Sequence, residues 1–245
     1  MAAAKYRRQE GVFLAEGVKV VRELLRSPCR TPTLMVLSGR ERRWAPVLDG
    51  LPYPVATYLL TEGEWRGISQ DKEPEGVMAL VQMPPPPTLA DIPDEHKRHL
   101  LLGHNINNPN NFGALLRTAH WFGIRTVISS RGSVESTHPK VVRSSMGSLF
   151  HLNILEEADF TTLLAELKHS YALIATDTAG GATPRAMSGK SALLMGNETH
   201  GLPADLKAQA DACWHIPRRG DADSLSLPQA AAIMMYELTK EGQEQ

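Results

Sequence analysis

The chain has 245 residues, of which 42% are hydrophobic and 22% charged, as in a soluble globular protein with a substantial core. No apolar run approaches the roughly 18 residues of a membrane-spanning helix, and no apolar stretch follows the basic residues near the start, which argues against a secretory signal. Two cysteines, Cys29 and Cys213, lie far apart and in no ligand spacing, which predicts a cytoplasmic protein without disulfides or a bound metal.

The formal net charge of −1 is unevenly distributed along the chain. Residues 1–50 hold ten Lys or Arg against five Asp or Glu, whereas the remainder holds 16 against 22. A basic part beside an acidic part indicates binding to a polyanion such as RNA, although a solvated basic surface would give the same count. The ten basic residues are Lys5, Arg7, Arg8, Lys19, Arg22, Arg26, Arg30, Arg40, Arg42 and Arg43.

Alternating helical and strand-like patterns predict a small α/β domain over residues 1–83. The predicted helices cover 17–25, 42–48 and a short stretch at 62–65, and the predicted strands cover 33–38, 54–60 and 76–83. The four consecutive prolines at 84–87 are incompatible with a helix or a central strand. Residues 84–98 are therefore predicted to form a stiff, extended linker.

A second α/β domain is predicted over residues 99–245, because short apolar strands alternate there with longer helical patterns. This alternation is typical of a mainly parallel sheet with helices on both faces. The predicted strands cover 99–104, 126–130, 150–155, 171–177, 192–197 and 213–216. The predicted helices cover 111–123, 138–145, 160–168, 204–210 and 227–240.

Several common chemical signatures are missing from the sequence. There is no G-x-G-x-x-G after a strand, no G-x-x-x-x-G-K-[ST] and no G-x-S-x-G. The nine histidines lack cysteines or carboxylates at metal-ligand spacing. The chemistry is therefore expected to need neither a metal nor a covalent nucleophile.

The first candidate functional loop lies at the start of the stretch NNPNNFGALLRTAHWFG, residues 107–123. Asn108 and Pro109 predict a turn, and Asn110 or Asn111 is expected to cap the following helix. Arg117 shares a helical face with Gly113, so the glycine either admits a ligand beside the arginine or permits tight packing of the helix. The buried stripe is predicted to consist of Phe112, Leu115, Leu116, Ala119 and Phe122.

Two further loops follow apolar strands. In MGNETHGLP at 195–203, Gly196 and Gly201 bracket a sharp loop with Glu198 at its tip, although a plain turn would show the same pattern. In IPRRGDADSLSLPQAAA at 216–232, Ser226 is the expected N-cap of a helix, and Pro228 in its first turn costs no hydrogen bond. The alanine-rich face of this helix indicates close packing, either within the core or against a second subunit.

Taken in this order, the three loops resemble the motifs of the SpoU (TrmH-like) branch of the SPOUT RNA methyltransferases. The first family motif, roughly D-P-x-N-x-G-x-x-x-R-T-A, stands here at 108–119, and the second, G-x-E-x-x-G-L, at 196–202. The third, I-P-x-x-G-x-x-x-S-L-N-V-S-x-A, stands at 216–230. The resemblance covers residues 100–240, and the N-terminal part is similar to the small RNA-binding domain that often precedes such enzymes.

The resemblance implies a C-terminal trefoil knot, a homodimer, and methyl transfer from S-adenosylmethionine to a ribose 2′-hydroxyl of tRNA or rRNA. It implies that Arg117 clamps an RNA phosphate and assists deprotonation of the hydroxyl, with Asn111 and Glu198 holding it. Ser224 and Ser226 are the other implied catalytic residues. The implied cofactor-binding residues are Thr176, Gly196, Asn197, Ile216, Pro217, Leu225 and Ser226.

The sequence departs from the motifs at three positions, where Asn108, Ser226 and Pro228 replace the usual aspartate, asparagine and serine. A serine hydroxyl offers one donor where an amide offers two. The sequence therefore does not determine the rate of the reaction or its substrate. Two interpretations therefore remain, an active methyltransferase and a knotted RNA-binding protein with weakened or lost activity. An unrelated nucleotide-binding enzyme is disfavoured by the missing phosphate loops.

Overall fold

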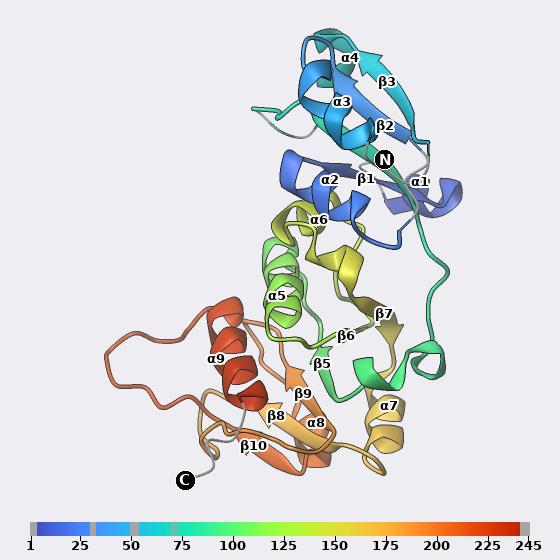
Figure 1. Cartoon of the computed structure of the whole chain (residues 1–245). Helices are drawn as coiled ribbons and strands as arrows, with labels where there is room; N and C mark the ends of the chain where they lie inside the picture. Colours follow the sequence, from blue (N-terminus) through green and yellow to red (C-terminus); the bar gives the residue numbers. More distant parts are fainter. Residues whose placement is uncertain (1–3, 30–32, 50–53, 70, 72, 241–245) are drawn as a thin grey trace.

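The described chain forms two β-sheets, one at each end of an elongated molecule (Figure 1). The structure is a computed structural model that describes residues 4–29, 33–49, 54–69, 71 and 73–240, and Arg30 lies outside these ranges. Within the described ranges, no helix has both the length and the apolar character needed to cross a membrane.

The N-terminal sheet has four strands in the order β1-β4-β2-β3, with β2 parallel to β3 and β4 antiparallel to both of its neighbours. The predicted helices and strands are found, but α1 and β1 were not predicted, and α1 has no apolar stripe because its buried residue is Arg7. The elements are α1 (Ala4–Glu10), β1 (Val12–Glu16), α2 (Val18–Leu25), β2 (Thr33–Leu37), α3 (Glu41–Asp49), β3 (Ala56–Leu60), α4 (Glu62–Ile68) and β4 (Val77–Gln82).

The proline-rich segment that follows β4 is extended only in its first half. Residues 84–87 are neither helix nor strand, and two short 3-10 turns follow, η1 (Leu89–Asp91) and η2 (Asp94–His96). Ile92 between the turns is buried, and the Tyr171 hydroxyl donates to the Lys97 carbonyl at 2.9 Å. The second half of the segment therefore packs on the C-terminal unit.

The C-terminal sheet has six strands in the order β10-β8-β9-β5-β6-β7, and every neighbouring pair is parallel. This confirms the predicted, mainly parallel α/β architecture. The strands are β5 (His99–Gly103), β6 (Thr126–Ser130), β7 (Asn153–Ala158), β8 (Ala172–Thr176), β9 (Ser191–Met195) and β10 (Ala212–Trp214). The helices are α5 (Pro109–Trp121), α6 (Pro139–Ser144), α7 (Phe160–Leu167), α8 (Ala204–Gln209) and α9 (Leu227–Thr239), with a 3-10 turn η3 (Ser148–His151).

Helices cover both faces of this sheet because the strand side chains alternate between two apolar clusters. In β5, Leu101 belongs to the cluster formed with α5, α6 and α9, whereas Leu100 and Leu102 belong to the cluster formed with α7 and α8. Strands with both faces buried read as continuous apolar runs, which is why they could be located from the sequence.

The two units share a buried interface. Phe13 of β1 stacks on Phe150 of η3 with ring centroids 6.3 Å apart. Arg7 of α1 is 1% exposed and forms an ion pair with Glu135, in the segment after β6. The same carboxylate pairs with Arg8 at 2.5 Å. Arg7 was counted above as part of a basic surface, and the structure corrects this, because a side chain inside the interface cannot reach a polyanion.

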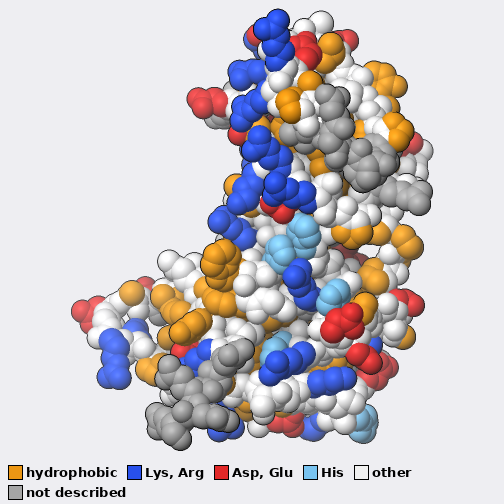
Figure 2. All heavy atoms as spheres, in the orientation of Figure 1, with side chains coloured by type: hydrophobic (Ala, Val, Ile, Leu, Met, Phe, Trp, Pro, Cys, Tyr) orange, Lys and Arg blue, Asp and Glu red, His pale blue; other side chains and the backbone are white. Residues whose placement is uncertain are grey.

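Other basic side chains of the N-terminal unit remain at the surface. Lys and Arg side chains gather over this unit on the face shown in Figure 2. The exposed members of the group are Lys5, Arg8, Lys19, Arg22, Arg26, Arg40, Arg42 and Arg43.

Candidate active site

The three motif loops leave the sheet along one edge. Gly103 and Met195, the last residues of β5 and β9, lie opposite each other, and so do Thr176 and Trp214, the last residues of β8 and β10. The carboxyl ends of parallel strands meet at one edge, which is where α/β proteins bind their ligands. The loops after β5, β9 and β10 are the first, second and third motifs.

The first motif begins with a capped helix. Asn108 is the N-cap of α5, and its Oδ1 accepts from the backbone N–H groups of Asn110 and Asn111 at 3.0 and 3.5 Å. The expectation that Asn110 or Asn111 caps the helix is therefore wrong. Pro109 occupies the first helical position, which proline favours because no N–H is needed there. Asn108 also explains one departure from the family motif, since asparagine caps as well as aspartate.

Gly113 is needed for contact between two helices. A Cβ added at this position would lie 1.9 Å from Ser144 Oγ and 2.7 Å from the Val141 carbonyl oxygen, both on α6. The tight-packing interpretation is therefore confirmed, although the neighbour is a helix.

Arg117 projects from the exposed side of α5. With a rise of about 1.5 Å per residue, it lies about 12 Å along the helix from Pro109. Within the part of the chain that the structure describes, Arg117 has no hydrogen bond or ion pair, so its expected contacts with Asn111 and Glu198 are not formed inside one chain. Asn111 is half-buried and Glu198 is exposed.

The second motif is a loop held together by Asn197. Its Oδ1 accepts from the N–H groups of Thr199 and His200 at 2.9 and 3.3 Å, and its Nδ2 donates to the Asn105 carbonyl at 2.9 Å. The last bond joins the second motif to the segment that leads into the first. The Asn197 side-chain amide is therefore engaged within the protein, and its main-chain carbonyl accepts from the Gly201 N–H at 2.8 Å.

The third motif forms a long segment that projects from the body of the molecule before α9 (Figure 1). Ile216 at its start is half-buried, whereas Pro217, Ser224 and Leu225 are exposed. Ser226 is the N-cap of α9, as predicted, and its N–H and hydroxyl both donate to Gln229 Oε1, at 3.2 and 3.0 Å.

The edge formed by β8, β9 and β10 suits a cofactor bound mainly through main-chain groups. Gly196 is packed so closely that an added Cβ would lie 2.3 Å from the Gly201 carbonyl carbon. Thr176 donates its hydroxyl to the Leu194 carbonyl at 2.9 Å, which ties β8 to β9 at the edge. Bare main chain beside the half-buried Ile216 and the exposed Pro217 fits the S-adenosylmethionine that the resemblance implies. Among the described residues, no group of three or more His, Cys, Asp or Glu could hold a metal ion.

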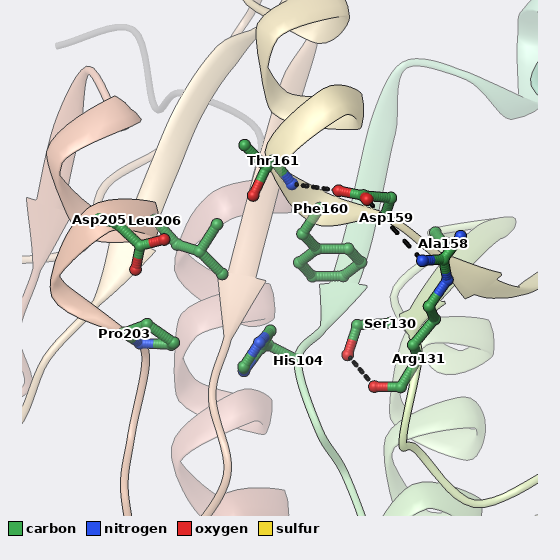
Figure 3. Close-up of a pocket in the computed structure, with 10 residues that line it drawn as sticks. All are labelled: His104, Ser130, Arg131, Ala158, Asp159, Phe160, Thr161, Pro203, Asp205 and Leu206. Carbon is green, nitrogen blue, oxygen red and sulfur yellow. Dashed lines mark hydrogen bonds and ion pairs between the residues drawn. The ribbon is translucent and has the colours of Figure 1, made fainter.

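Sequence patterns missed one hollow at the carboxyl edge. An open pocket of about 240 Å³ lies over β6, β7 and the starts of α7 and α8 (Figure 3). His104, directly after β5, contributes a ring to it, and burial lowers the pKa of this histidine below its usual value. The only sequence signal was position, since each lining segment follows a predicted strand or opens a predicted helix.

Comparisons with known proteins identify the family. The SpoU rRNA Methylase family matches residues 98–236, and the MRM3-like substrate binding domain matches residues 1–79. The chain therefore belongs to the SpoU rRNA Methylase family of RNA 2′-O-methyltransferases, which use S-adenosylmethionine.

Individual relatives match almost the whole chain. The 23S rRNA (guanosine(2553)-2′-O)-methyltransferase RlmP of Bacillus subtilis is 30% identical over 237 residues, which cover 96% of this chain and 91% of the relative. The 23S rRNA (uridine(2479)-2′-O)-methyltransferase of Streptomyces viridochromogenes is 29% identical over 96% of this chain and 85% of its own length. The structure of the SpoU methyltransferase AviRb from the same organism, in complex with AdoMet, is 26% identical with a TM-score of 0.84, and the match covers 96% of this chain and 92% of that one.

Proposed function

We propose that this chain transfers the methyl group of S-adenosylmethionine to a ribose 2′-hydroxyl of ribosomal RNA. One observation carries the proposal: all three motif loops follow strands that end at the carboxyl edge of one parallel sheet. Ribosomal RNA is favoured over transfer RNA because the curated relatives described above are named as 23S rRNA methyltransferases.

The roles of the side chains follow from their chemistry. S-adenosylmethionine, when bound, supplies the electrophilic methyl group. Arg117, which stays protonated, binds an RNA phosphate and helps the 2′-hydroxyl to lose its proton, while Asn111, Glu198 and the hydroxyls of Ser224 and Ser226 position the ribose. The proposed cofactor site consists of Thr176, Gly196, Asn197, Ile216, Pro217, Leu225 and Ser226.

A homodimer would complete this site. Arg117 is unpaired within the described chain and lies well along α5 from the sheet edge, so we propose that it acts on the site of a second copy. Trp121, one turn further along α5, is 83% exposed, and Ile233 and Tyr236 of α9 are 40% and 54% exposed. Figure 2 shows hydrophobic side chains gathered over α9. Exposed apolar patches of this kind mark protein interfaces.

The domain boundaries, the knot and the cellular compartment belong to the same proposal. We propose an RNA-binding unit at 1–83, a linker at 84–98 and a catalytic unit at 99–245 that carries a trefoil knot and works in the cytoplasm. Contacts between distant segments support the knot, because Ala182 pairs with Trp214 and the Met187 N–H donates to the Leu238 carbonyl at 3.1 Å.

The decisive experiment measures cofactor binding and methyl transfer separately. Calorimetry gives the affinity for S-adenosylmethionine, and labelled cofactor with unmodified ribosomal RNA gives the product. Arg117→Ala is expected to abolish transfer and leave cofactor affinity near normal, whereas Lys140→Ala, which removes an exposed charge from α6, leaves both unchanged. Cofactor binding without any transfer by the wild type would favour the inactive RNA-binding alternative, and equal loss of both by Arg117→Ala would contradict the role of Arg117.

A further inference from the structure

The pocket shown in Figure 3 lies apart from the proposed cofactor edge. It is lined by the ends of β6 and β7, the first residues of α7 and α8, and His104 after β5. The cofactor edge belongs to β8, β9 and β10 at the other half of the sheet. At about 240 Å³ the pocket is smaller than the ~300–1,000 Å³ of typical small-molecule sites. It therefore suits one ring system rather than a whole cofactor.

Two aromatic rings form the middle of the pocket. His104 and Phe160 have ring centroids 5.8 Å apart with a tilt of 54°. The Nδ1 atom of His104 is buried and has no hydrogen-bond partner in the described part of the chain, and burial lowers the pKa of this ring, which favours the neutral imidazole. Because Nδ1 is buried, a ligand in the pocket would meet the other atoms of the ring.

Opposite charges lie on the two sides of these rings. Figure 3 shows Asp205 on one side of His104 and Phe160 and Arg131 on the other. The Asp205 carboxylate has no hydrogen bond or ion pair with any residue that the structure describes. The Arg131 guanidinium lies 4.0 Å from Asp159, but its side chain is 72% exposed, so it keeps free donors. The pocket thus offers an acceptor at one end and donors at the other.

The pocket is joined directly to the motif loops. The His104 N–H donates to the Met195 carbonyl at 2.8 Å, immediately before the second motif. The Asn105 N–H donates to Ser130 Oγ at 2.8 Å, and its carbonyl accepts from Asn197 Nδ2 at 2.9 Å. Hydrogen bonds therefore connect the segment that lines the pocket to the loop that carries the proposed catalytic Glu198.

We propose that this pocket receives a guanine base of the RNA substrate. Guanine carries two adjacent donors, N1–H and N2–H, that match the Asp205 carboxylate, and two acceptors, O6 and N7, that match Arg131. Bases that leave the stack are commonly bound on aromatic side chains, a role for which Phe160 and His104 are placed. Adenine lacks the paired donors and would leave the carboxylate unsatisfied. This inference rests on the proposed function, which brings an RNA substrate to this edge of the sheet.

The test uses the full chain and guanosine 5′-monophosphate as the probe, titrated by calorimetry and ligand-observed NMR. Saturable binding is expected, with at least tenfold weaker binding in Asp205→Asn, which keeps the shape but removes the negative charge and replaces one acceptor oxygen by an NH2 donor. Glu166→Gln removes an exposed carboxylate from α7 outside the pocket and serves as the matched control, with binding unchanged. Adenosine 5′-monophosphate and ribose 5-phosphate separate recognition of the base from recognition of sugar and phosphate.

Three results would overturn the guanine site: no saturable binding of the guanine nucleotide, equal binding by the adenine nucleotide or ribose 5-phosphate, or unchanged binding in Asp205→Asn. Methyl transfer to ribosomal RNA and affinity for S-adenosylmethionine are measured on the same samples. Transfer by the wild type, together with any of these results, removes the guanine site and leaves the proposed function intact. Absence of both transfer and cofactor binding in the wild type removes the proposed function itself.

Discussion

Gly113 is a position where a substitution that normally stabilises a helix should do the reverse. Alanine gains about 1 kcal/mol over glycine in an open helix. Here the new Cβ would lie 1.9 Å from Ser144 Oγ and 2.7 Å from the Val141 carbonyl oxygen. We expect Gly113→Ala to lower the free energy of unfolding by about 1–3 kcal/mol, as overpacking does. Urea titrations should show partial recovery on adding Ser144→Ala. Gly67→Ala in α4, where an added Cβ would meet no atom within 4 Å apart from its neighbours in the same helix, is the control and should not destabilise.

His99 should make the fold sensitive to mild acid. Burial lowers its pKa from 6.5 to about 4, and its Nδ1 lies 2.7 Å from Ser191 Oγ. Between pH 7 and pH 5 the unfolded chain takes up a proton that the folded chain does not, so stability falls as the pH falls. After discounting for partial exposure, we expect wild type to lose about 1 kcal/mol more than His99→Gln over this range. Equal losses in urea titrations at the two pH values would contradict this assignment.

The sequence predicted most of the helices and strands of the C-terminal sheet because their apolar patterns are local. Ser226 could be recognised as the cap of α9 from the helical pattern that follows it. The cap of α5 was misplaced by two or three residues, although Pro109 marks the first helical position. The pocket at His104 could not be predicted, since it depends on how four separate loops converge in space.

Asn197 is the residue on which the geometry of the second motif loop depends. Replacing it by alanine removes two acceptor contacts inside the loop and the donor to Asn105. We expect Asn197→Ala to cost about 1–3 kcal/mol of stability and to weaken S-adenosylmethionine binding severalfold, because the loop no longer holds its main chain in place. Thr199→Ala changes an exposed neighbour in the same loop and is the control. Unchanged cofactor affinity in Asn197→Ala, measured by calorimetry, would remove this loop from the cofactor site.

At the scale of the whole molecule, charge counting located a basic unit but could not distinguish surface from interface. Arg7 and Arg8 are neighbours in the sequence, yet Arg7 is buried against the C-terminal unit and Arg8 is exposed. Their shared partner, Glu135, lies more than a hundred residues away, and no local pattern predicts such a pairing. Only the structure therefore shows which of these two arginines lies at the surface.

Arg7 and Arg43 should separate stability from RNA binding. Removing one partner of a buried ion pair is destabilising, and although Arg8 still contacts Glu135, Arg7→Met should lower the free energy of unfolding by about 3 kcal/mol. Because Arg7 and Glu135 contact each other, adding Glu135→Gln to Arg7→Met should cost less than the sum of the single changes. Arg43→Met changes an exposed side chain and should leave stability within about 0.5 kcal/mol. If Arg43 contacts a phosphate, its loss reduces the slope of log binding constant against log salt by about 0.9, whereas Arg7→Met leaves that slope unchanged under conditions where the variant is folded. A reduced slope for Arg7→Met, or full stability of that variant in urea, would show that Arg7 reaches RNA instead of joining the two units.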